Sequence, residues 1–327
     1  MKRLYILTNF ILFSISIYCQ YPSHSFSVLN YNNTARSAAL GGYSIAVLDN
    51  DPTTGILLPS NIQKENSGHL VMNYVNYFAD SDYGLLNYTY HFKNIGVFSA
   101  SFIYCDYGTF EYADPSGFKS GNNFYVYDIM SQIGYSKKLL DNLQVGFNLK
   151  FASSQYQQYN SLALASDISA TYFDNKKQFG SSFLIQNIGR SLKSFQPTTT
   201  KESLPFNIQF AINKKLAHSP IRFHLILHDL QQWNINTDKS SNNSFSYHLT
   251  NHIVLASEFL LSENFNFRLG YNFKNRRDLQ PLSRAGSTGF SWGVGFKVKK
   301  LRINYSLTKF HFSGTSNNFT LIRKIAN

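Results

Sequence analysis

The chain has 327 residues, of which 16% are aromatic and only 15% are charged, and its formal net charge is +12. After the N-terminal segment, no run approaches the roughly 18 consecutive apolar residues that a membrane-spanning helix needs, which excludes a helical membrane protein. The positive charge forms no stripe with interleaved stacking residues, which argues against nucleic-acid binding.

The first 19 residues have the composition of a secretory signal peptide. Lys2 and Arg3 precede an apolar run over residues 4–18 that is interrupted by small polar residues. Such a segment is removed during export. We expect cleavage after Cys19, and lipidation of Cys19 is the alternative, which the bulky side chain of Tyr18 disfavours.

Residues 20–68 differ from the rest of the mature chain because they are rich in glycine and small residues, and 43–48 is predicted to be a short strand. The segment is too short for a core of its own. We predict a hatch inside a barrel formed by residues 69–327, since small residues let the backbone pack closely against a wall. The predicted hatch motif consists of Thr34, Ala35, Arg36, Ala39, Leu40, Gly41 and Gly42. We expect Arg36 to pair with a lumen carboxylate such as Asp167 or Glu258.

Residues 69–327 contain about fourteen short segments in which apolar and polar residues alternate. The clearest is 143–151, and the same period of two returns in 206–213, 265–274 and 290–298. Side chains of a strand alternate between two faces, whereas a helix would scatter these apolar residues around its circumference. The pattern predicts an all-β fold, a 14-stranded antiparallel transmembrane β-barrel. The many tyrosines and phenylalanines suit the aromatic girdles of such a barrel.

The connections between these segments are alternately tight and long. The tight ones are 93–94, 137–142, 174–177, 214–220, 262–264 and 299–300. The others, which include all the long ones, are 79–82, 106–123, 156–162, 187–204, 230–249, 275–287 and 313–317. In an antiparallel meander, successive connections lie at opposite ends of the sheet. We therefore expect an outer-membrane barrel with tight turns in the periplasm and long loops at the cell surface.

Lysine pairs mark several tight connections. They are residues 137–138, 176–177, 214–215 and 299–300. The favoured interpretation is that these lysines lie at phospholipid phosphates and keep the strand ends out of the hydrocarbon. The alternative is a basic periplasmic collar for an acidic partner.

Three patterns resemble catalytic or metal motifs. Residues 116–119 match the Ser-x-x-Lys pattern of penicillin-binding enzymes, but the partner motifs of that class are missing from the sequence. His224 and His228 would lie about 13 Å apart on a strand, too far to share one metal ion. His311 and Ser313 would share a strand face, but no orienting third group can be named. We predict a protein that is not an enzyme and has no cofactor or metal.

Several blocks of the mature chain resemble PorQ-type proteins of the PorV/PorQ family in the bacterial type IX secretion system. They are residues 34–42, 74–80, 104–110, 186–189, 204–206, 214–218, 228–233, 267–272 and 289–293. The likeness spans essentially the whole mature chain. Residues 58–60 read Leu-Pro-Ser where relatives commonly have Asn-Pro-Ala, and the C-terminus lacks the terminal aromatic residue of many barrels.

The resemblance implies a barrel similar to the fatty-acid transporter FadL, with an N-terminal hatch, in the outer membrane of Bacteroidota. It implies a non-enzymatic part of the attachment complex that holds a PorZ-like surface protein and, through it, PorU and PorV, while cargo is attached to anionic lipopolysaccharide. A FadL-like channel for hydrophobic compounds is the alternative.

The long loops are the expected partner-binding surface of such an anchor. They carry aromatic and arginine side chains of the kind that dominate binding energy. The predicted contact residues are Tyr107, Phe110, Tyr112, Phe118, Trp233, Arg276, Arg277 and Arg284. For Trp233, a place in the aromatic girdle is an equally good interpretation.

Overall fold

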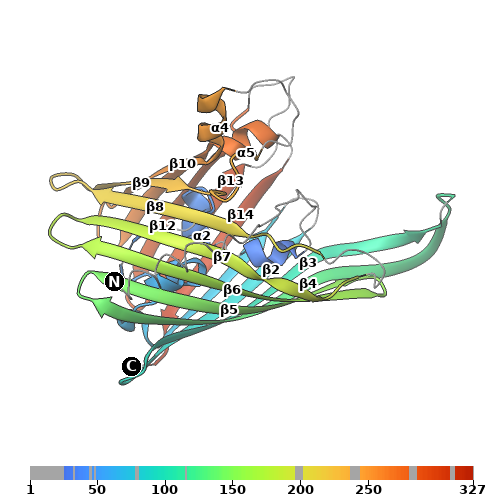
Figure 1. Ribbon diagram of the computed structural model, residues 1–327, viewed down its shortest axis with the longest axis horizontal. Coiled ribbons are helices and arrows are strands. Elements are labelled where there is room, and N and C mark those ends of the chain that lie inside the picture. Colours follow the sequence, from blue (N-terminus) through green and yellow to red (C-terminus); the bar gives the residue numbers. More distant parts are fainter. Residues whose placement is uncertain are drawn as a thin grey trace, which may run out of the picture.

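A computed structural model describes residues 26–31, 34–43, 46–47, 49–77, 81–114, 116–195, 202–235, 244–279, 286–309 and 314–326. Fourteen strands form a closed barrel in which each strand pairs with its neighbours in sequence and the first strand pairs with the last. All the pairings are antiparallel (Figure 1). The predicted 14-stranded antiparallel barrel is confirmed, whereas the predicted signal peptide lies outside the described residues.

The strands range from seven to 22 residues in length. They are β1 (His69–Asn76), β2 (Asp82–Phe92), β3 (Gly96–Ala113), β4 (Lys119–Leu140), β5 (Leu143–Tyr156), β6 (Tyr159–Asp174), β7 (Phe179–Lys193), β8 (Asn207–Lys215), β9 (Ile221–Leu227), β10 (Ile253–Phe259), β11 (Phe265–Asn272), β12 (Phe290–Val298), β13 (Leu301–Lys309) and β14 (Thr315–Lys324). The helices are η1 (Ser27–Asn30), α2 (Ala35–Ala39), α3 (Thr54–Leu57), η2 (Pro59–Asn61), η3 (Lys64–Asn66), α4 (Phe245–Asn251) and α5 (Phe273–Leu279). Within the described residues, no helix is long and apolar enough to span a bilayer.

Every strand presents a large apolar side chain on the outer face. These exposed residues include Tyr74, Leu86, Phe102, Ile133, Phe147, Ile168, Phe183, Phe210, Phe223, Leu255, Leu269, Trp292, Ile303 and Phe319. The intervening side chains point inward and are mostly polar, as Asn148 and Lys150 illustrate in β5. A soluble protein does not expose a continuous apolar belt of this kind, whereas a bilayer covers it in a transmembrane barrel.

The two ends of the barrel differ, and we call them the tight-turn end and the long-loop end. The turns after β2 and β12 are at the tight-turn end, and the connections that carry α4 and α5 are at the long-loop end (Figure 1). Some of the predicted connections are longer than the observed ones. Of the predicted connection 156–162, only residues 157–158 lie outside the strands, because β5 and β6 pair up to Tyr156 and Tyr159. Of the lysine pairs, 137–138 and 214–215 lie in strand ends and not in turns.

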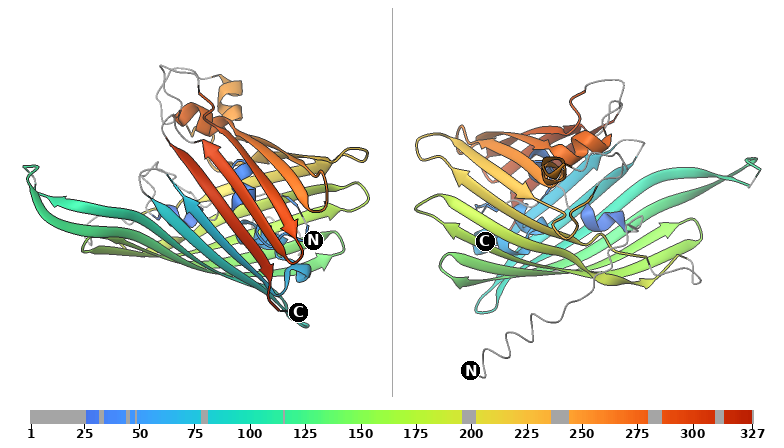
Figure 2. Two further views of the ribbon diagram at one scale, coloured as in Figure 1. Left: turned by 180° about the vertical axis from the view of Figure 1, so that it is seen from behind. Right: turned by 45° about the horizontal axis from the view of Figure 1, so that its top comes forward.

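The predicted long loop 106–123 is mostly strand. β3 and β4 continue past their neighbours as a two-stranded ribbon, which we call the arm and which projects from the long-loop end (Figure 2). The Asp114 carboxylate accepts hydrogen bonds from the backbone N–H groups of Ser116 and Phe118, and Gly117 has a φ of +84°. These contacts close a tight turn at the tip. The glycine-rich sequence of this segment is typical of a loop and predicted one. The two strands pair all the same, because the hydrogen bonds between them join backbone groups and do not require particular side chains.

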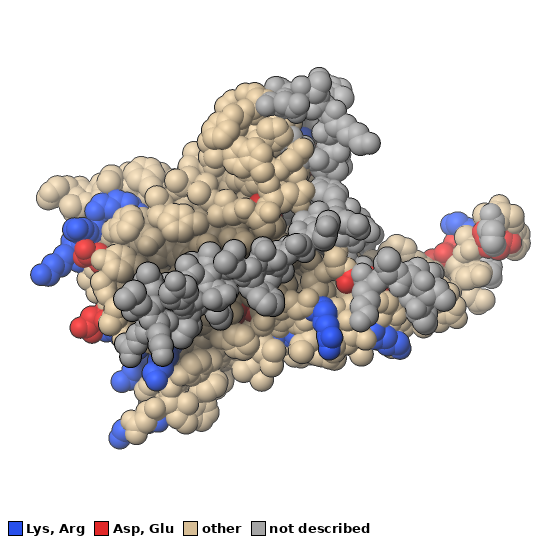
Figure 3. All heavy atoms as spheres, in the orientation of Figure 1, with Lys and Arg blue, Asp and Glu red and all other residues tan. Residues whose placement is uncertain are grey.

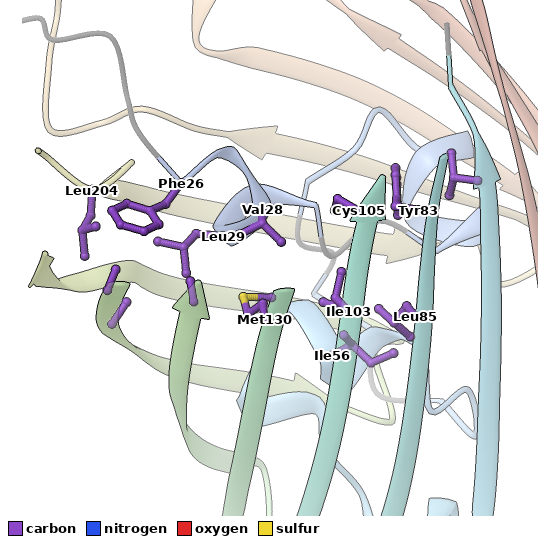
Figure 4. Close-up of a cluster of buried hydrophobic side chains, with 14 of the residues drawn as sticks. Phe26, Val28, Leu29, Ile56, Tyr83, Leu85, Ile103, Cys105, Met130 and Leu204 are labelled. Carbon is purple, nitrogen blue, oxygen red and sulfur yellow. The ribbon is translucent and has the colours of Figure 1, made fainter. Parts of the chain in front are cut away.

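Residues 26–68, as far as they are described, lie inside the barrel and are called the hatch. Val28, Leu29 and Ile56 of the hatch pack against Ile103 and Met130 of the wall (Figure 4). A second apolar cluster joins hatch residues Leu40, Ala46 and Val47 to Ala211, Ile226 and Val254 of the opposite wall. The described residues of the predicted strand 43–48 are not in a strand.

One wall glycine shows how closely the hatch is packed. A Cβ atom added to Gly146 of β5 would overlap the backbone of Pro59 and Ser60. The Ser60 backbone N–H also donates to Ser169 Oγ of β6 at 2.8 Å. Close approach of backbones is what glycine permits in a strand, so this part of the wall is shaped to the hatch.

Candidate functional site in the barrel lumen

Arg36 makes five charge-assisted hydrogen bonds, of which the two to Glu258 fasten the hatch to the wall and the three to Asp49 and Asp51 stay within the hatch. Its Nε and Nη2 donate to the two carboxylate oxygens of Glu258, both at 2.9 Å. Its Nη1 and Nη2 donate to the two oxygens of Asp49 at 2.9 and 2.7 Å, and Nη1 also reaches Asp51 Oδ2 at 3.1 Å. Only 3% of the Arg36 side chain is exposed. Its planar fork therefore makes two bidentate pairs in a buried place.

Glu258 of β10 collects further donors from the strands on either side of it. Arg222 Nη1 of β9 donates to it at 3.0 Å and Arg268 Nε of β11 at 3.1 Å, while His224 Nε2 lies 3.3 Å away. Among the described residues, four arginines thus meet three carboxylates, and we call this group the ion cluster: Arg36, Arg222, Arg268 and Arg302 with Asp49, Asp51 and Glu258. Arg36 pairs with Glu258 as the sequence predicted. The other suggested carboxylate, Asp167, instead pairs with Lys150 within the wall at 2.8 Å.

The ion cluster also keeps the Asp51 carboxylate of the hatch ionised. Burial by itself would raise the pKa of the Asp51 carboxyl, but Arg36, Arg302 and Arg268 lower it to about 2, against 3.8 for a free side chain. Burial lowers the pKa of Arg36, and the three carboxylates raise it well above the usual range. Arg36 and Asp51 are therefore an ion pair at neutral pH.

A cavity of about 310 Å³ lies on the other side of the hatch, toward the long-loop end. We call it the upper cavity. It is lined by the tyrosines Tyr31, Tyr43, Tyr77 and Tyr83, by the amides of Asn30, Gln186, Asn207, Gln209, Asn272, Asn275 and Asn318, and by Asp229, Lys274, Thr308 and Ser316 among others. A mixture of aromatic rings and a few polar groups is typical of sites for small organic molecules.

The charged groups in the lining of the upper cavity are paired with one another. Asp229, just after β9, accepts from Lys274 Nζ at 3.1 Å and lies 3.0 Å from His228 Nδ1. Burial raises the pKa of the Asp229 carboxyl. The opposite effect of His228 and Lys274 is larger, so the pKa lies below its usual value. The Tyr43 ring stacks on His228 with centroids 4.0 Å apart. The other nitrogen of His228, Nε2, is buried and has no hydrogen-bond partner among the described residues.

Sequence reasoning missed this upper cavity. Its four tyrosines come from two hatch segments and from the loop ends of β1 and β2. No local pattern connects them, because closure of the barrel is what brings these segments together. The Asp229–Lys274 pair is also invisible in the sequence, since the two residues are 45 positions apart.

The predicted partner-binding residues fall into different surroundings. Phe110, Tyr112 and Phe118 are exposed on the arm, and Phe118 reaches 73% exposure. Trp233 is 50% exposed and packs against Phe245 of α4 with ring centroids 5.3 Å apart. These four side chains are accessible to a partner, and partner binding stays a prediction.

The remaining predicted contact residues have internal partners or are not described. Tyr107 of β3 packs inside the barrel, where its hydroxyl lies 3.0 Å from Ser27 Oγ of the hatch and donates to Asp128 Oδ2 at 2.8 Å. Arg277 donates to the Tyr247 carbonyl and to Thr250 Oγ1, both at 2.6 Å, and lies 4.2 Å from the centroid of the Tyr247 ring. Arg276 donates to the Gly286 carbonyl. Arg284 lies outside the described residues.

The fold is similar to that of several solved hydrocarbon transporters. The toluene transporter TbuX of Ralstonia pickettii has a TM-score of 0.55 at 10% identity, covering 90% of this chain and 98% of that chain. The toluene transporter TodX of Pseudomonas putida gives 0.53 at 11% identity, covering 89% and 96%. The monoaromatic hydrocarbon channel CymD gives 0.52 at 11% identity, covering 90% and 98%. At these identities the likeness shows the fold alone, a barrel of the FadL type.

No protein-family model matches the chain, and neither does any curated protein. These comparisons therefore give no link to the type IX secretion system that the sequence resemblance implies.

Proposed function

We propose that this protein is a non-enzymatic outer-membrane channel that admits a small, largely hydrophobic compound through the upper cavity. The observation that carries the proposal is the position of this cavity, which lies between the long-loop end and the hatch inside a closed barrel. The apolar outer belt and the barrel fold shared with toluene transporters support it. In the orientation we propose, the long loops are at the cell surface and the tight turns are in the periplasm.

The residues that line the upper cavity indicate which class of compound it would bind. Four tyrosines offer flat apolar faces, and several amides offer hydrogen bonds. Asn207 and Asn272 already hydrogen-bond to Asp229, Gly41 and Asn275, but each side-chain amide offers two hydrogens and two lone pairs, so it can hydrogen-bond a ligand as well. We therefore propose as substrate a small aromatic compound that carries a hydrogen-bonding group. Passage beyond the cavity requires the hatch to shift, because the ion cluster and the apolar contacts hold it in the lumen.

Uptake of p-cresol and of toluene by cells that produce the protein tests this function. Ser316→Phe places a ring in the cavity lining, since Ser316 of β14 is buried and faces the lumen. Thr315→Phe is the matched control, because the neighbouring residue is exposed on the outer face of the same strand. We expect accelerated uptake of p-cresol that Ser316→Phe abolishes and Thr315→Phe leaves intact. Equal uptake with and without the protein, or full uptake by the Ser316→Phe variant, would contradict the proposal.

The arm favours a second function, the anchoring of a surface protein. Between the described residues, β2 pairs with β3 only as far as Asp106, and β5 pairs with β4 only from Val126. In the described part of the chain, no third strand therefore pairs with the outer part of the ribbon on either side. Unpaired strand edges accept an additional strand from another polypeptide, and the exposed aromatics beside them provide apolar contacts.

We propose the PorZ-like surface protein as the occupant of the arm, with PorU and PorV linked through it and lipopolysaccharide as the acceptor of cargo. The test replaces residues 109–123 by a two-residue Asn-Gly turn, which suits a hairpin. Mild-detergent pulldown with mass spectrometry should recover the partner with the full-length protein and not with the shortened one. Equal recovery with both proteins would remove the arm from this role without affecting the channel proposal.

A further inference from the structure

A second cavity, of about 260 Å³, opens at the tight-turn end between the hatch and the wall, and we call it the basic cavity. Five basic side chains line it, Lys297, Lys299, Lys300, Arg302 and Lys324. In this lining the only carboxylate of a described residue is Glu65. Lysines and arginines also gather at this end of the molecule in Figure 3.

The strand register places three of these cations on the lumen side of the wall. Lys297 of β12 pairs with Arg302 of β13, and Lys324 of β14 pairs with His69 of β1. The alternate residues Phe296 and Ile303 of β12 and β13 are exposed on the lipid face, so Lys297 and Arg302 face the lumen. Phospholipid phosphates outside the barrel cannot neutralise cations on this side. Contact with phospholipid phosphates, the interpretation favoured for the lysine pairs, therefore does not account for Lys297 and Arg302.

The charges of the basic cavity are poorly balanced. Among the described residues, Lys297, Lys299, Lys300 and Lys324 form no ion pair, whereas Lys138 and Lys177 beside other turns of the tight-turn end pair with Asp141 and Asp174.

Arg302 is the exception in the basic cavity, because it contacts Asp51 Oδ2 of the hatch at 3.7 Å and donates to the Asn50 carbonyl at 3.2 Å. Like charges confined in one concave space repel each other and attract a counter-ion strongly.

The turn between β12 and β13 adds a second observation. Lys299 has a φ of +56°, a conformation that asparagine and glycine adopt much more readily in a two-residue hairpin turn. Lysine at this position places a charge at the mouth of the basic cavity at the expense of turn stability. Residues held in an unfavourable backbone conformation often lie at functional sites.

We propose that the basic cavity binds a small soluble anion that carries a phosphate group and enters from the aqueous periplasm. Four cations without ion-pair partners match an anion with two or more negative charges, and lysine ammonium groups act as point-charge donors to phosphate oxygens. The volume of about 260 Å³ accommodates a compound the size of pyrophosphate and leaves no room for a folded partner. A lipid headgroup has the same chemistry, but the lumen-facing positions of Lys297 and Arg302 favour the soluble source.

Isothermal titration of the mature protein in non-ionic detergent with pyrophosphate tests this site. We expect saturable binding of one anion per chain. Lys297→Gln combined with Lys324→Gln should weaken binding by about tenfold or more for each lysine that contacts the anion, as expected for charge-assisted hydrogen bonds. Lys176→Gln combined with Lys177→Gln is the matched control, because it removes the same charge from another tight turn, and should leave binding unchanged.

Lys299→Asn provides a variant that keeps the fold, because asparagine suits the positive φ of this turn. It should weaken pyrophosphate binding while leaving the barrel at least as stable to heat in semi-native electrophoresis. Absence of saturable binding, or an equal loss in the control double variant, would overturn the proposal. Retention of phosphatidylglycerol in nanodiscs without any binding of soluble pyrophosphate would overturn it as well, since the lipid would then be the source.

Discussion

Replacing Arg36 by methionine should release the hatch from the barrel wall. The change removes five hydrogen bonds and leaves the carboxylates of Asp49, Asp51 and Glu258 without their shared cation. Removing one partner of a buried ion pair costs about 3–5 kcal/mol. Arg222 stays 3.0 Å from Glu258 and 3.3 Å from Asp49, and it offsets part of the loss. We therefore expect a cost of about 3 kcal/mol, the lower end of that range.

A cost of about 3 kcal/mol corresponds to an increase of about 100-fold in the population with a displaced hatch. This population is measurable by maleimide labelling of Ala39→Cys, because Ala39 is fully buried in α2. The native Cys105 packs in the same cluster as hatch residues and would also become accessible on hatch release, so all variants are made in a Cys105→Ala background. Labelling should accelerate about 100-fold if hatch opening limits access. Arg36→Lys should give an intermediate rate, since it keeps the charge and loses the bidentate fork.

The control separates hatch release from general damage. Lys150→Met breaks a buried ion pair of the same kind, with Asp167, but this pair lies within the wall and does not contact α2. It should lower the stability of the barrel without accelerating labelling of Ala39→Cys. If Arg36→Met labels at the wild-type rate, or if both variants label equally fast, the ion cluster does not hold the hatch.

Three further predictions follow from the same contacts. Because the pKa of Asp51 is lowered from 3.8 to about 2, its contribution to hatch docking, about 2 kcal/mol, is fully present above pH 4 and is lost as the pH falls through 2. Labelling of Ala39→Cys after brief acid exposure checks this, and a loss of docking between pH 5 and 7 would contradict it. Gly146→Leu should displace the hatch or prevent folding, because the added side chain meets the Pro59 backbone. The control Gly84→Ala places a methyl group in open space on the outer face and should change the stability of the barrel by less than about 0.5 kcal/mol. Semi-native electrophoresis compares the heat stability of the two variants. Arg277→Gln should loosen α4, with faster hydrogen exchange at residues 245–251 and unchanged exchange in β10, because Arg277 donates to Tyr247 and Thr250.

The alternation of apolar and polar residues was enough to predict the barrel and its strand number. In β5, Phe147 and Leu149 face lipid, whereas Asn148 and Lys150 face the lumen. Successive side chains of a strand point to opposite faces, so this difference is visible in the sequence of each strand by itself. The Arg36–Glu258 pair was predictable for a related reason. A buried arginine needs carboxylates, and few of them face the lumen in the strand pattern.

The arm and the upper cavity could not be predicted in the same way. The arm carries Gly108, Gly117 and Gly121, and its side chains are exposed on both faces, so no apolar face marks it as strand. The upper cavity depends on which hatch residues come to lie beside which strand ends. Its shape is a property of the closed barrel and not of any single segment.

The arm gives the molecule reach. A transmembrane strand crosses the bilayer in about ten residues, whereas β4 has 22. The surplus of about 12 residues corresponds to about 40 Å of extended chain at about 3.3 Å per residue. An aromatic tip at the end of such a spacer stands clear of the lipid headgroups, where it can contact large molecules that do not approach the bilayer itself.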